Sequence, residues 1–298
     1  MSNEQGNSDN PEAAAERGPT VLRIALGSRL RQLREGCGIS REAAGEHIRG
    51  SHAKISRLEL GRTGFKERDL RDLLDLYGVR DEATLDTYLQ LMRRANESGW
   101  WQPYNDLLPT WFETYIGLEQ AATTIRTYEA QFVPGLLQTR DYARSVIMLG
   151  NDDEMERRVT IRLRRQDILS RSAPPTLWAV LDENMLRRPV GGVPVLRAQI
   201  EHLLEVSEKP NVKIQVLPYE VGGHPAASGS FSILRFPEPE LSDVVYLEQL
   251  TSSYYLEKKQ DVELYMTVMN KLSVQSLTPG ESRDFLRKVL SELSDEEN

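Results

Sequence analysis

The sequence has little of what a disulfide-stabilised, membrane-spanning or metal-binding protein needs. It contains one cysteine, Cys37, in 298 residues, so an internal disulfide cannot form, and this usage fits a reducing cytoplasm. No stretch approaches the roughly 20 apolar residues of a membrane-spanning helix. The four histidines are not surrounded by clustered carboxylates at metal-ligand spacing, so we expect no metal and no cofactor.

The N-terminal end also lacks apolar residues in a run. Residues 1–19 therefore predict a disordered tail and not a signal peptide, which favours a cytoplasmic protein. Hydrophobic residues make up 39% of the chain, enough for a small N-terminal domain and a second domain with its own core. The pattern changes near Gly99, and we expect one domain over 20–95 and another over 100–292.

Charge is distributed unevenly along the chain. The formal net charge is −8, yet residues 20–80 hold 13 Lys and Arg against 8 Asp and Glu. Basic residues on the outer face of a helical bundle often only keep it soluble, and that is the alternative interpretation. Segregation of positive charge into one segment is what phosphate binding requires, so the distribution favours a nucleic-acid partner.

Residues 40–61 have the pattern of a short helix, a tight turn and a second helix. Small residues at 43–45 allow the two helices to cross closely, and apolar residues at helical spacing face inward. Ser40 and Ser51 are placed to cap the two helices, and helix N-termini also attract phosphate. The outer face of the second helix is left free to touch a duplex.

This segment resembles the Cro/repressor (XRE-type) helix-turn-helix family, most specifically over KISRLELGR at 54–62. The resemblance implies that 51–60 is the recognition helix in the major groove of double-stranded DNA, and that Arg34 pairs with Glu59 inside the domain. It implies base contacts from His52, Ala53 and Arg57 and phosphate contacts from Ser40, Arg41 and Ser56. The remaining predicted DNA-binding residues are Arg49, Ser51, Lys54 and Arg62.

The turn departs from the family pattern. The family usually has glycine directly after the apolar residue that ends the first helix, whereas Arg49 stands there and Gly50 follows. Either the turn is shifted by one residue, or Arg49 takes a positive φ at some cost in strain and offers its side chain to phosphate. Gly45 stands where the family commonly has alanine, at a helix-propensity cost of up to about 1 kcal/mol.

Beyond residue 81 the periodicity predicts both helices and strands. Alternating apolar residues predict strands at 176–183, 212–219, 229–236 and 243–250, with 253–257 a candidate partner strand. Helical periodicity covers 81–96, 111–128, 139–149, 152–171, 194–208, 258–276 and 280–292. We therefore expect a mainly helical N-terminal domain with a helix-turn-helix, and an α+β C-terminal domain with a largely antiparallel sheet.

The second domain resembles a C-terminal domain of unknown function (DUF5753-like) that follows XRE-type helix-turn-helices in regulators of Streptomyces and related actinobacteria. The resemblance rests on segments such as WFETYIGLEQAA at 111–122, YEAQFVPGLLQTRDYAR at 128–144 and DVVYLE at 243–248. The regulators with this domain include the WhiJ-like and antitoxin-like groups. It implies a transcription regulator tied to development or secondary metabolism, often encoded beside a small partner protein.

Two features of the second domain are candidates for binding a ligand or a partner. Arg158, Arg162 and Arg165 line one face of a predicted helix, where they could hold a phosphate, a carboxylate or an acidic protein. The alternative is a surface helix whose arginines pair with the domain's own carboxylates. His224 lies in a glycine-flanked loop that could shape a pocket, or it is a loop histidine hydrogen-bonded within the fold.

Two classes of function stay open, and neither is an enzyme, since the chain lacks a nucleophile-elbow motif. In the first, a homodimer binds an operator and the C-terminal domain senses an unknown small molecule or a partner protein. In the second, the chain is an antitoxin-like protein-binding module whose DNA contact only autoregulates its operon.

Overall fold

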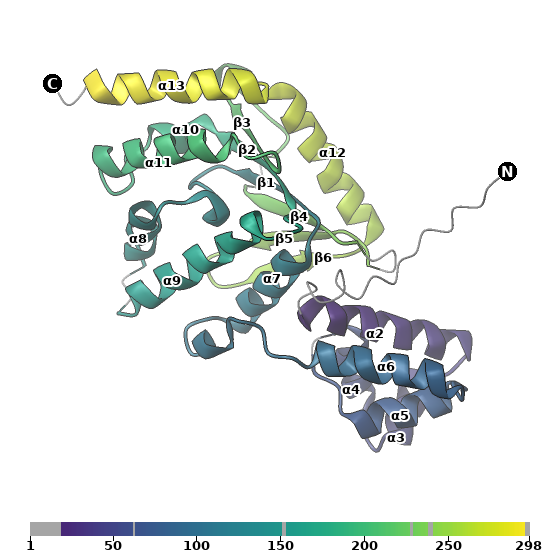
Figure 1. Ribbon diagram of the computed structural model, residues 1–298. Coiled ribbons are helices and arrows are strands. Elements are labelled where there is room, and N and C mark those ends of the chain that lie inside the picture. Colours follow the sequence, from purple (N-terminus) through teal and green to yellow (C-terminus); the bar gives the residue numbers. More distant parts are fainter. Residues whose placement is uncertain (1–18, 62, 151–152, 227–228, 238–240, 296–298) are drawn as a thin grey trace. The chain divides into compact units, whose positions relative to one another are not determined.

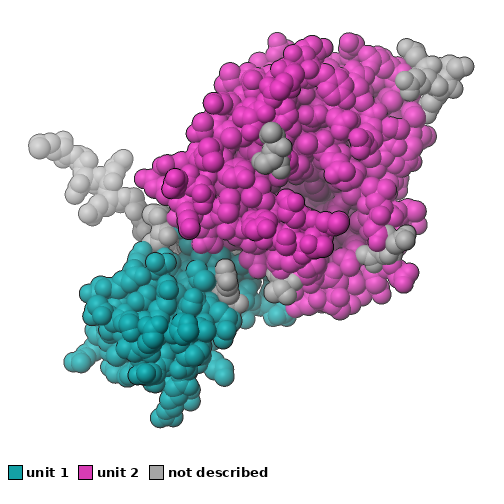
Figure 2. Space-filling view, turned by 180° about the vertical axis from the view of Figure 1, so that it is seen from behind, with its two compact units in different colours: residues 1–102, 238–241 teal, residues 103–237, 242–298 magenta. Residues whose placement is uncertain are grey.

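The computed structural model describes residues 19–61, 63–150, 153–226, 229–237 and 241–295. Apart from Pro19, the tail predicted over 1–19 lies outside these residues, and so does Arg62. The described chain divides into two compact units (Figure 2). One runs to Gln102 and also takes in Leu241, and the other comprises the remaining residues from Pro103 onward.

The described part of the N-terminal unit is helical, as predicted. An apolar cluster that includes Leu26, Leu30, Ile48, Ile55 and Leu70 forms its core, because each helix turns one apolar stripe inward. Its helices are α2 (Pro19–Gly36), α3 (Arg41–His47), α4 (His52–Glu59), α5 (Glu67–Leu76) and α6 (Glu82–Ala95) (Figure 1).

The close crossing of α3 and α4 depends on Gly45 more than on its alanine neighbours. A Cβ built on Gly45 would lie 2.8 Å from the carbonyl carbon of Ser51 and 3.0 Å from the amide nitrogen of His52. Ala44 is buried but Ala43 is exposed, so its assignment to the contact was wrong. Glycine therefore stands at 45 because a Cβ has no room there, which outweighs its helix-propensity cost.

The C-terminal unit is built on one six-stranded mixed sheet in the order β3-β2-β1-β4-β5-β6. The pairs β1–β2 and β2–β3 are parallel, and β1–β4, β4–β5 and β5–β6 are antiparallel. The strands are β1 (Thr124–Glu129), β2 (Thr176–Asp182), β3 (Val212–Leu217), β4 (Phe231–Arg235), β5 (Val244–Glu248) and β6 (Ser253–Leu256). The α+β class with a mostly antiparallel sheet is confirmed.

The prediction of one helix over 111–128 was wrong, because the segment holds a helix and then a strand. Helix α7 (Thr110–Ala121) ends where Ala122 takes an extended backbone, with φ −63° and ψ 141°. The β-branched and aromatic residues of TIRTYE then form β1, which pairs with both β2 and β4. Sheet pairing on both sides decides the conformation of this short apolar run, which local periodicity does not.

Helices cover both faces of this sheet (Figure 1). Helix α12 (Lys259–Gln275) packs Val262, Met269 and Leu272 onto one face. On the opposite face Tyr115 of α7 stacks on Tyr246 of β5 with ring centroids 4.1 Å apart. The other helices are α8 (Arg140–Met148), α9 (Met155–Arg165), α10 (Glu183–Arg187), α11 (Val193–Val206) and α13 (Pro279–Asp295).

The charged helix predicted over 152–171 is shorter than expected. Helix α9 ends at Arg165 and continues as a 3₁₀ turn, η3 (Gln166–Ser170).

Within the described ranges, no helix combines the length and the apolar character needed to cross a membrane.

Candidate functional site

The helices α3 and α4 and the turn between them have the geometry that the sequence predicted. The Ser40 hydroxyl accepts a hydrogen bond from the Ala43 amide at 3.1 Å, and the Ser51 hydroxyl accepts one from the Lys54 amide at 3.3 Å. Both serines have extended backbones and are exposed. The N-termini of both helices are therefore capped by side chains that also face solvent.

Arg49 takes a positive φ of 52°. Of the two alternatives for this turn, a shift by one residue or a positive φ at Arg49, the structure has the second. It is the one non-glycine residue with positive φ in the part of the chain that the structure describes. The turn closes because the Gly50 amide donates to the Gly45 carbonyl at 2.8 Å. The Arg49 side chain is exposed, so the strained residue presents a cation at the surface beside the second helix.

Replacing Arg49 by glycine is expected to stabilise the N-terminal unit by roughly 0.5–1 kcal/mol, because glycine adopts positive φ without a steric penalty. Thermal unfolding followed by circular dichroism measures the change. Arg49→Ala is the matched control, since it removes the same side chain but keeps a Cβ at the strained position. Equal melting temperatures for the two variants would contradict a strain cost at this turn.

Glu59 at the end of α4 binds two arginines of the same unit. Arg34, 8% exposed, donates to Glu59 through Nε at 2.5 Å and through Nη2 at 3.2 Å, which gives the internal pair that the family resemblance implied. The hydrogen bond that Arg34 donates to Glu59 is the main cause that raises the pKa of Arg34. Arg41 also donates to Glu59 at 2.8 Å with its side chain 36% exposed, so this predicted phosphate contact has an intramolecular partner.

Lys54 is likewise paired within the protein. Its ammonium lies 2.5 Å from the buried carboxylate of Asp69, which also accepts from Arg68 at 3.2 Å. Burial by itself would raise the pKa of Asp69, but the hydrogen bonds from Lys54 and Arg68 leave that pKa lowered. The face of α4 that was predicted to point outward therefore also makes an internal contact, since the ion pair of Lys54 with Asp69 joins α4 to α5.

Arg57 and His52 remain exposed on α4. Among the described residues, Arg57 has no hydrogen bond and no ion pair. Ala53 and Ser56 are half-buried on the same helix. The structure thus places the Arg57 guanidinium at the surface of α4, with no partner among the described residues.

The three arginines predicted on one face of α9 line a single cavity of about 160 Å³. The apolar part of its wall comes from α7 and the residues before it, from α8 and from α9 itself, and Glu248 at the end of β5 supplies a carboxylate. The full lining is Leu108, Pro109, Trp111, Phe112, Ile147, Arg158, Ile161, Arg162, Arg165 and Glu248. The arginine face is therefore a cavity wall in part, and not only a solvated helix surface.

Arg165 in the wall of this cavity is held rigidly. It donates to the fully buried Glu119 through Nε at 2.8 Å and Nη2 at 2.7 Å, and its guanidinium lies 5.1 Å from the Phe112 ring centroid and 5.3 Å from that of Tyr115. Burial alone would lower the pKa of Arg165, but the pairing with Glu119 raises it. This arginine therefore follows the alternative interpretation, in which the domain's own carboxylate neutralises it.

Sequence reasoning missed three residues that shape this cavity. Glu119, Glu248 and Trp111 all lie inside segments whose family resemblance is recognisable, but their roles depend on residues far away in the chain. Glu119 carried a local signal, because an acidic residue inside the apolar run GLEQAA on a helix must be paired if it is buried.

His224 is separate from the arginine cavity. Its Nε2 lies 3.2 Å from the Tyr128 hydroxyl, which is also 3.4 Å from the Asp182 carboxylate. This matches the interpretation of His224 as a loop histidine hydrogen-bonded within the fold. Asp182 in turn caps α10 by accepting from the Asn184 amide at 2.9 Å, as expected for a carboxylate at a strand end.

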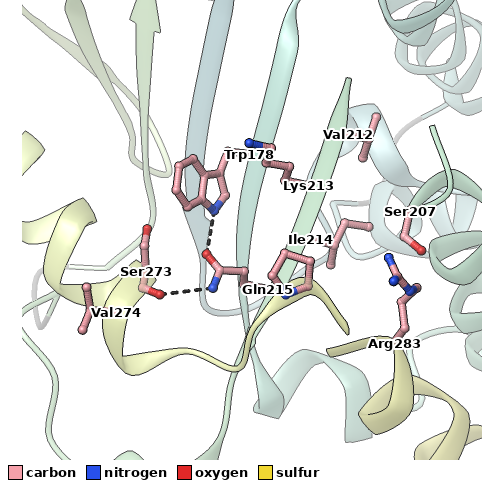
Figure 3. Close-up of a pocket in the computed structure, with 10 residues that line it drawn as sticks. Trp178, Ser207, Val212, Lys213, Ile214, Gln215, Ser273, Val274 and Arg283 are labelled. Carbon is pink, nitrogen blue, oxygen red and sulfur yellow. Dashed lines mark hydrogen bonds between the residues drawn. The ribbon is translucent and has the colours of Figure 1, made fainter. Parts of the chain in front are cut away.

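A second cavity, of about 500 Å³, lies beside the edge strand β3 (Figure 3). Its polar groups already have partners inside the protein: the Trp178 indole donates to Gln215 at 2.7 Å, and the Gln215 amide donates to the Ser273 carbonyl at 3.1 Å. Lys213 lies 5.4 Å from the Trp178 ring centroid. Although this cavity is larger, the polar side chains of Trp178 and Gln215 in its wall are bonded to each other and to the backbone.

A model of a known family matches a segment of each unit. Residues 25–87 match the model of a helix-turn-helix domain, and residues 112–288 match the model of a domain of unknown function, DUF5753. The chain is thus a helix-turn-helix protein with a C-terminal α+β domain. Because the second model covers more than half of its length, the chain belongs to the DUF5753 family. No curated protein and no solved structure matches it.

Proposed function

We propose that the chain is a sequence-specific, DNA-binding transcription regulator whose C-terminal domain receives a signal from a ligand or a partner protein. The helix-turn-helix domain suggests DNA binding. The observation that carries the proposal is the exposed Arg57 on α4, which no described residue pairs, beside a scaffold in which Glu59 holds Arg41 and Asp69 holds Lys54.

Because some of the predicted DNA-contacting cations are paired within the protein and others are not, we assign them different roles in binding. Arg57 and His52 are the side chains free to reach base edges, and a guanidinium suits the two acceptors of guanine in the major groove. Ser40, Ser51 and Arg49 surround the helix N-termini, where phosphate binds. Lys54 and Arg41 act mainly by holding α4 in place, and they add positive potential without a dedicated contact.

Arg57→Ala is expected to weaken binding to a selected site by about 1–3 kcal/mol, or roughly 5-fold to 150-fold, while binding to random DNA falls far less. Fluorescence anisotropy measures both affinities, after the site has been selected from genomic fragments with the full-length protein. Arg71→Ala is the control, because Arg71 is exposed on α5 and pairs with Glu67 at 2.8 Å. An equal loss on both kinds of DNA would exclude base readout by Arg57.

The proposal includes a homodimer. A single helix-turn-helix reads one half-site, and useful affinity comes from two half-sites about 34 Å apart on one face of the duplex. The selected site is therefore expected to be two-fold symmetric. Sedimentation of the complex with that site gives its stoichiometry directly.

The finer assignments from the family resemblance stay predictions. These are a role in development or secondary metabolism, an origin in Streptomyces or related actinobacteria, cytoplasmic location, and the absence of catalysis. The antitoxin-like module is the alternative, and co-purification of a stoichiometric small protein would favour it.

A further inference from the structure

The cavity beside α9 combines a compact apolar wall with a guanidinium that forms no ion pair among the described residues. Six of its ten lining residues are apolar, among them Trp111, Phe112 and Ile161. A dry cavity of about 150 Å³ in a protein core is large enough to hold benzene. A volume of about 160 Å³ therefore fits a body of roughly six to eight heavy atoms.

Arg162, one of the three arginines in this wall, has a neutral hydrogen-bond partner. Its Nη1 donates to the neutral amide oxygen of Gln138 at 3.0 Å, and none of the ion pairs among the described residues involves it. The Gln138 amide is itself fixed, because its nitrogen donates to the Val133 carbonyl at 2.6 Å. Burial lowers the pKa of Arg162 to about 10, which reflects the loss of water around its charge.

Arg165 differs from Arg162, although both face the same cavity. Its Nε and Nη2 are occupied by Glu119, and its guanidinium lies over two aromatic rings. Arg165 therefore forms part of the rigid wall. A carboxylate that enters the cavity can accept a hydrogen bond from the Arg162 guanidinium, and such a charge-assisted bond is shorter and stronger than the present one to a neutral amide.

Glu248 restricts the charge that the cavity accepts. Its carboxylate lines the same wall and accepts a hydrogen bond from the Tyr246 hydroxyl at 3.1 Å. This negative charge attracts Arg162 and partly offsets the lowering of its pKa by burial. It also repels a doubly charged anion more than a singly charged one, so the site favours a carboxylate over a phosphate monoester.

We propose that this cavity binds a small monocarboxylate with a compact apolar or aromatic body. The carboxylate lies on the Arg162 guanidinium, and the body packs against Trp111, Phe112 and Ile161. That this binding delivers the signal to the regulator rests on the proposed function, whereas the binding itself does not.

The test uses the full-length protein, four small organic probes and inorganic phosphate. Benzoate, phenylacetate and 3-methylbutanoate carry the required carboxylate, and benzamide is the neutral isostere of benzoate. Saturation-transfer NMR detects binding, and isothermal titration calorimetry gives the affinity. At least one carboxylate is expected to bind, and benzoate is expected to bind at least tenfold more tightly than benzamide or inorganic phosphate.

Two variants locate the site. Arg162→Gln is expected to weaken benzoate binding at least tenfold, whereas Arg164→Gln, an exposed position on the same helix, leaves it unchanged. Ile147→Trp fills the cavity and is expected to abolish binding with the circular dichroism spectrum preserved. Absence of binding by all three carboxylates, equal binding of benzamide, or unchanged binding by Arg162→Gln and Ile147→Trp would overturn the proposal.

The regulatory role is measured separately, as the affinity for the selected DNA site with and without saturating benzoate. A change in affinity that Arg162→Gln removes supports the role. Carboxylate binding that leaves DNA affinity unchanged overturns the regulatory role. An equal loss of affinity for both kinds of DNA in the Arg57→Ala experiment would count against the proposed function only, and not against carboxylate binding.

Discussion

Glu119→Ala is expected to cost the C-terminal unit about 3–5 kcal/mol of unfolding free energy, because it leaves the guanidinium of Arg165 buried without its anion. Both charges are almost completely inaccessible to water, with side chains 0% and 7% exposed, and two hydrogen bonds of 2.7 and 2.8 Å join them. The packing of Arg165 on Phe112 and Tyr115 prevents it from turning outward to solvent.

Peptide-resolved hydrogen exchange under mild denaturant measures this cost, since it reports on the two units separately. Glu156→Ala is the control: Glu156 pairs with Arg140 at 3.0 Å, but both side chains are more than half exposed, so the change is expected to stay below about 1 kcal/mol. The double variant Glu119→Leu, Arg165→Met is expected to recover most of the loss, because it removes both buried charges. Similar costs for Glu119→Ala and Glu156→Ala would contradict the importance of burial.

Gly27→Ala is expected to destabilise the N-terminal unit by about 3 kcal/mol, because a Cβ has no room at the contact between α2 and α4. That Cβ would lie 2.4 Å from the carbonyl oxygen of Leu58 and 2.6 Å from that of Glu59. These are backbone atoms at the end of α4, so they cannot turn away as a flexible side chain does. DNA affinity is expected to fall as well, since α4 carries Arg57.

Gly36→Ala is the matched control on the same helix. A Cβ at Gly36 meets nothing within 4 Å, so alanine is expected to be neutral or to stabilise by up to about 1 kcal/mol through helix propensity. Thermal unfolding and hydrogen exchange over 19–95 compare the two variants. Equal stability of Gly27→Ala and Gly36→Ala would show that α2 can move away from α4 at little cost.

Local sequence patterns predicted the helices and caps of the N-terminal unit, because these features depend on residues that are close together in the chain. Caps at Ser40 and Ser51 need only a hydroxyl before a helix, and the apolar stripes of α2 and α5 follow the helical period. The strained Arg49 was recognisable from the displaced glycine of the turn. Hairpin β5–β6 was also predicted, since a short turn joins two alternating segments.

Prediction failed where partners far apart in the chain decide the outcome. Strand β1 was assigned to a helix because a short run with several apolar residues fits both patterns until β2 and β4 pair with it. The internal partners of Lys54 and Arg41 were also not predicted, because Asp69 and Glu59 lie 15 and 18 residues further along the chain.

The sequence by itself determined the helix-turn-helix, the α+β class of the second domain and the presence of an arginine face on α9, because periodicity, caps and motif spacing are local properties. Only the tertiary structure decided what each charge does. It pairs Arg165 with Glu119 across 46 residues, and it leaves Arg162 beside an apolar cavity with a neutral amide as its partner. Burial and pairing depend on the packed surroundings of a side chain, and those surroundings come from distant segments.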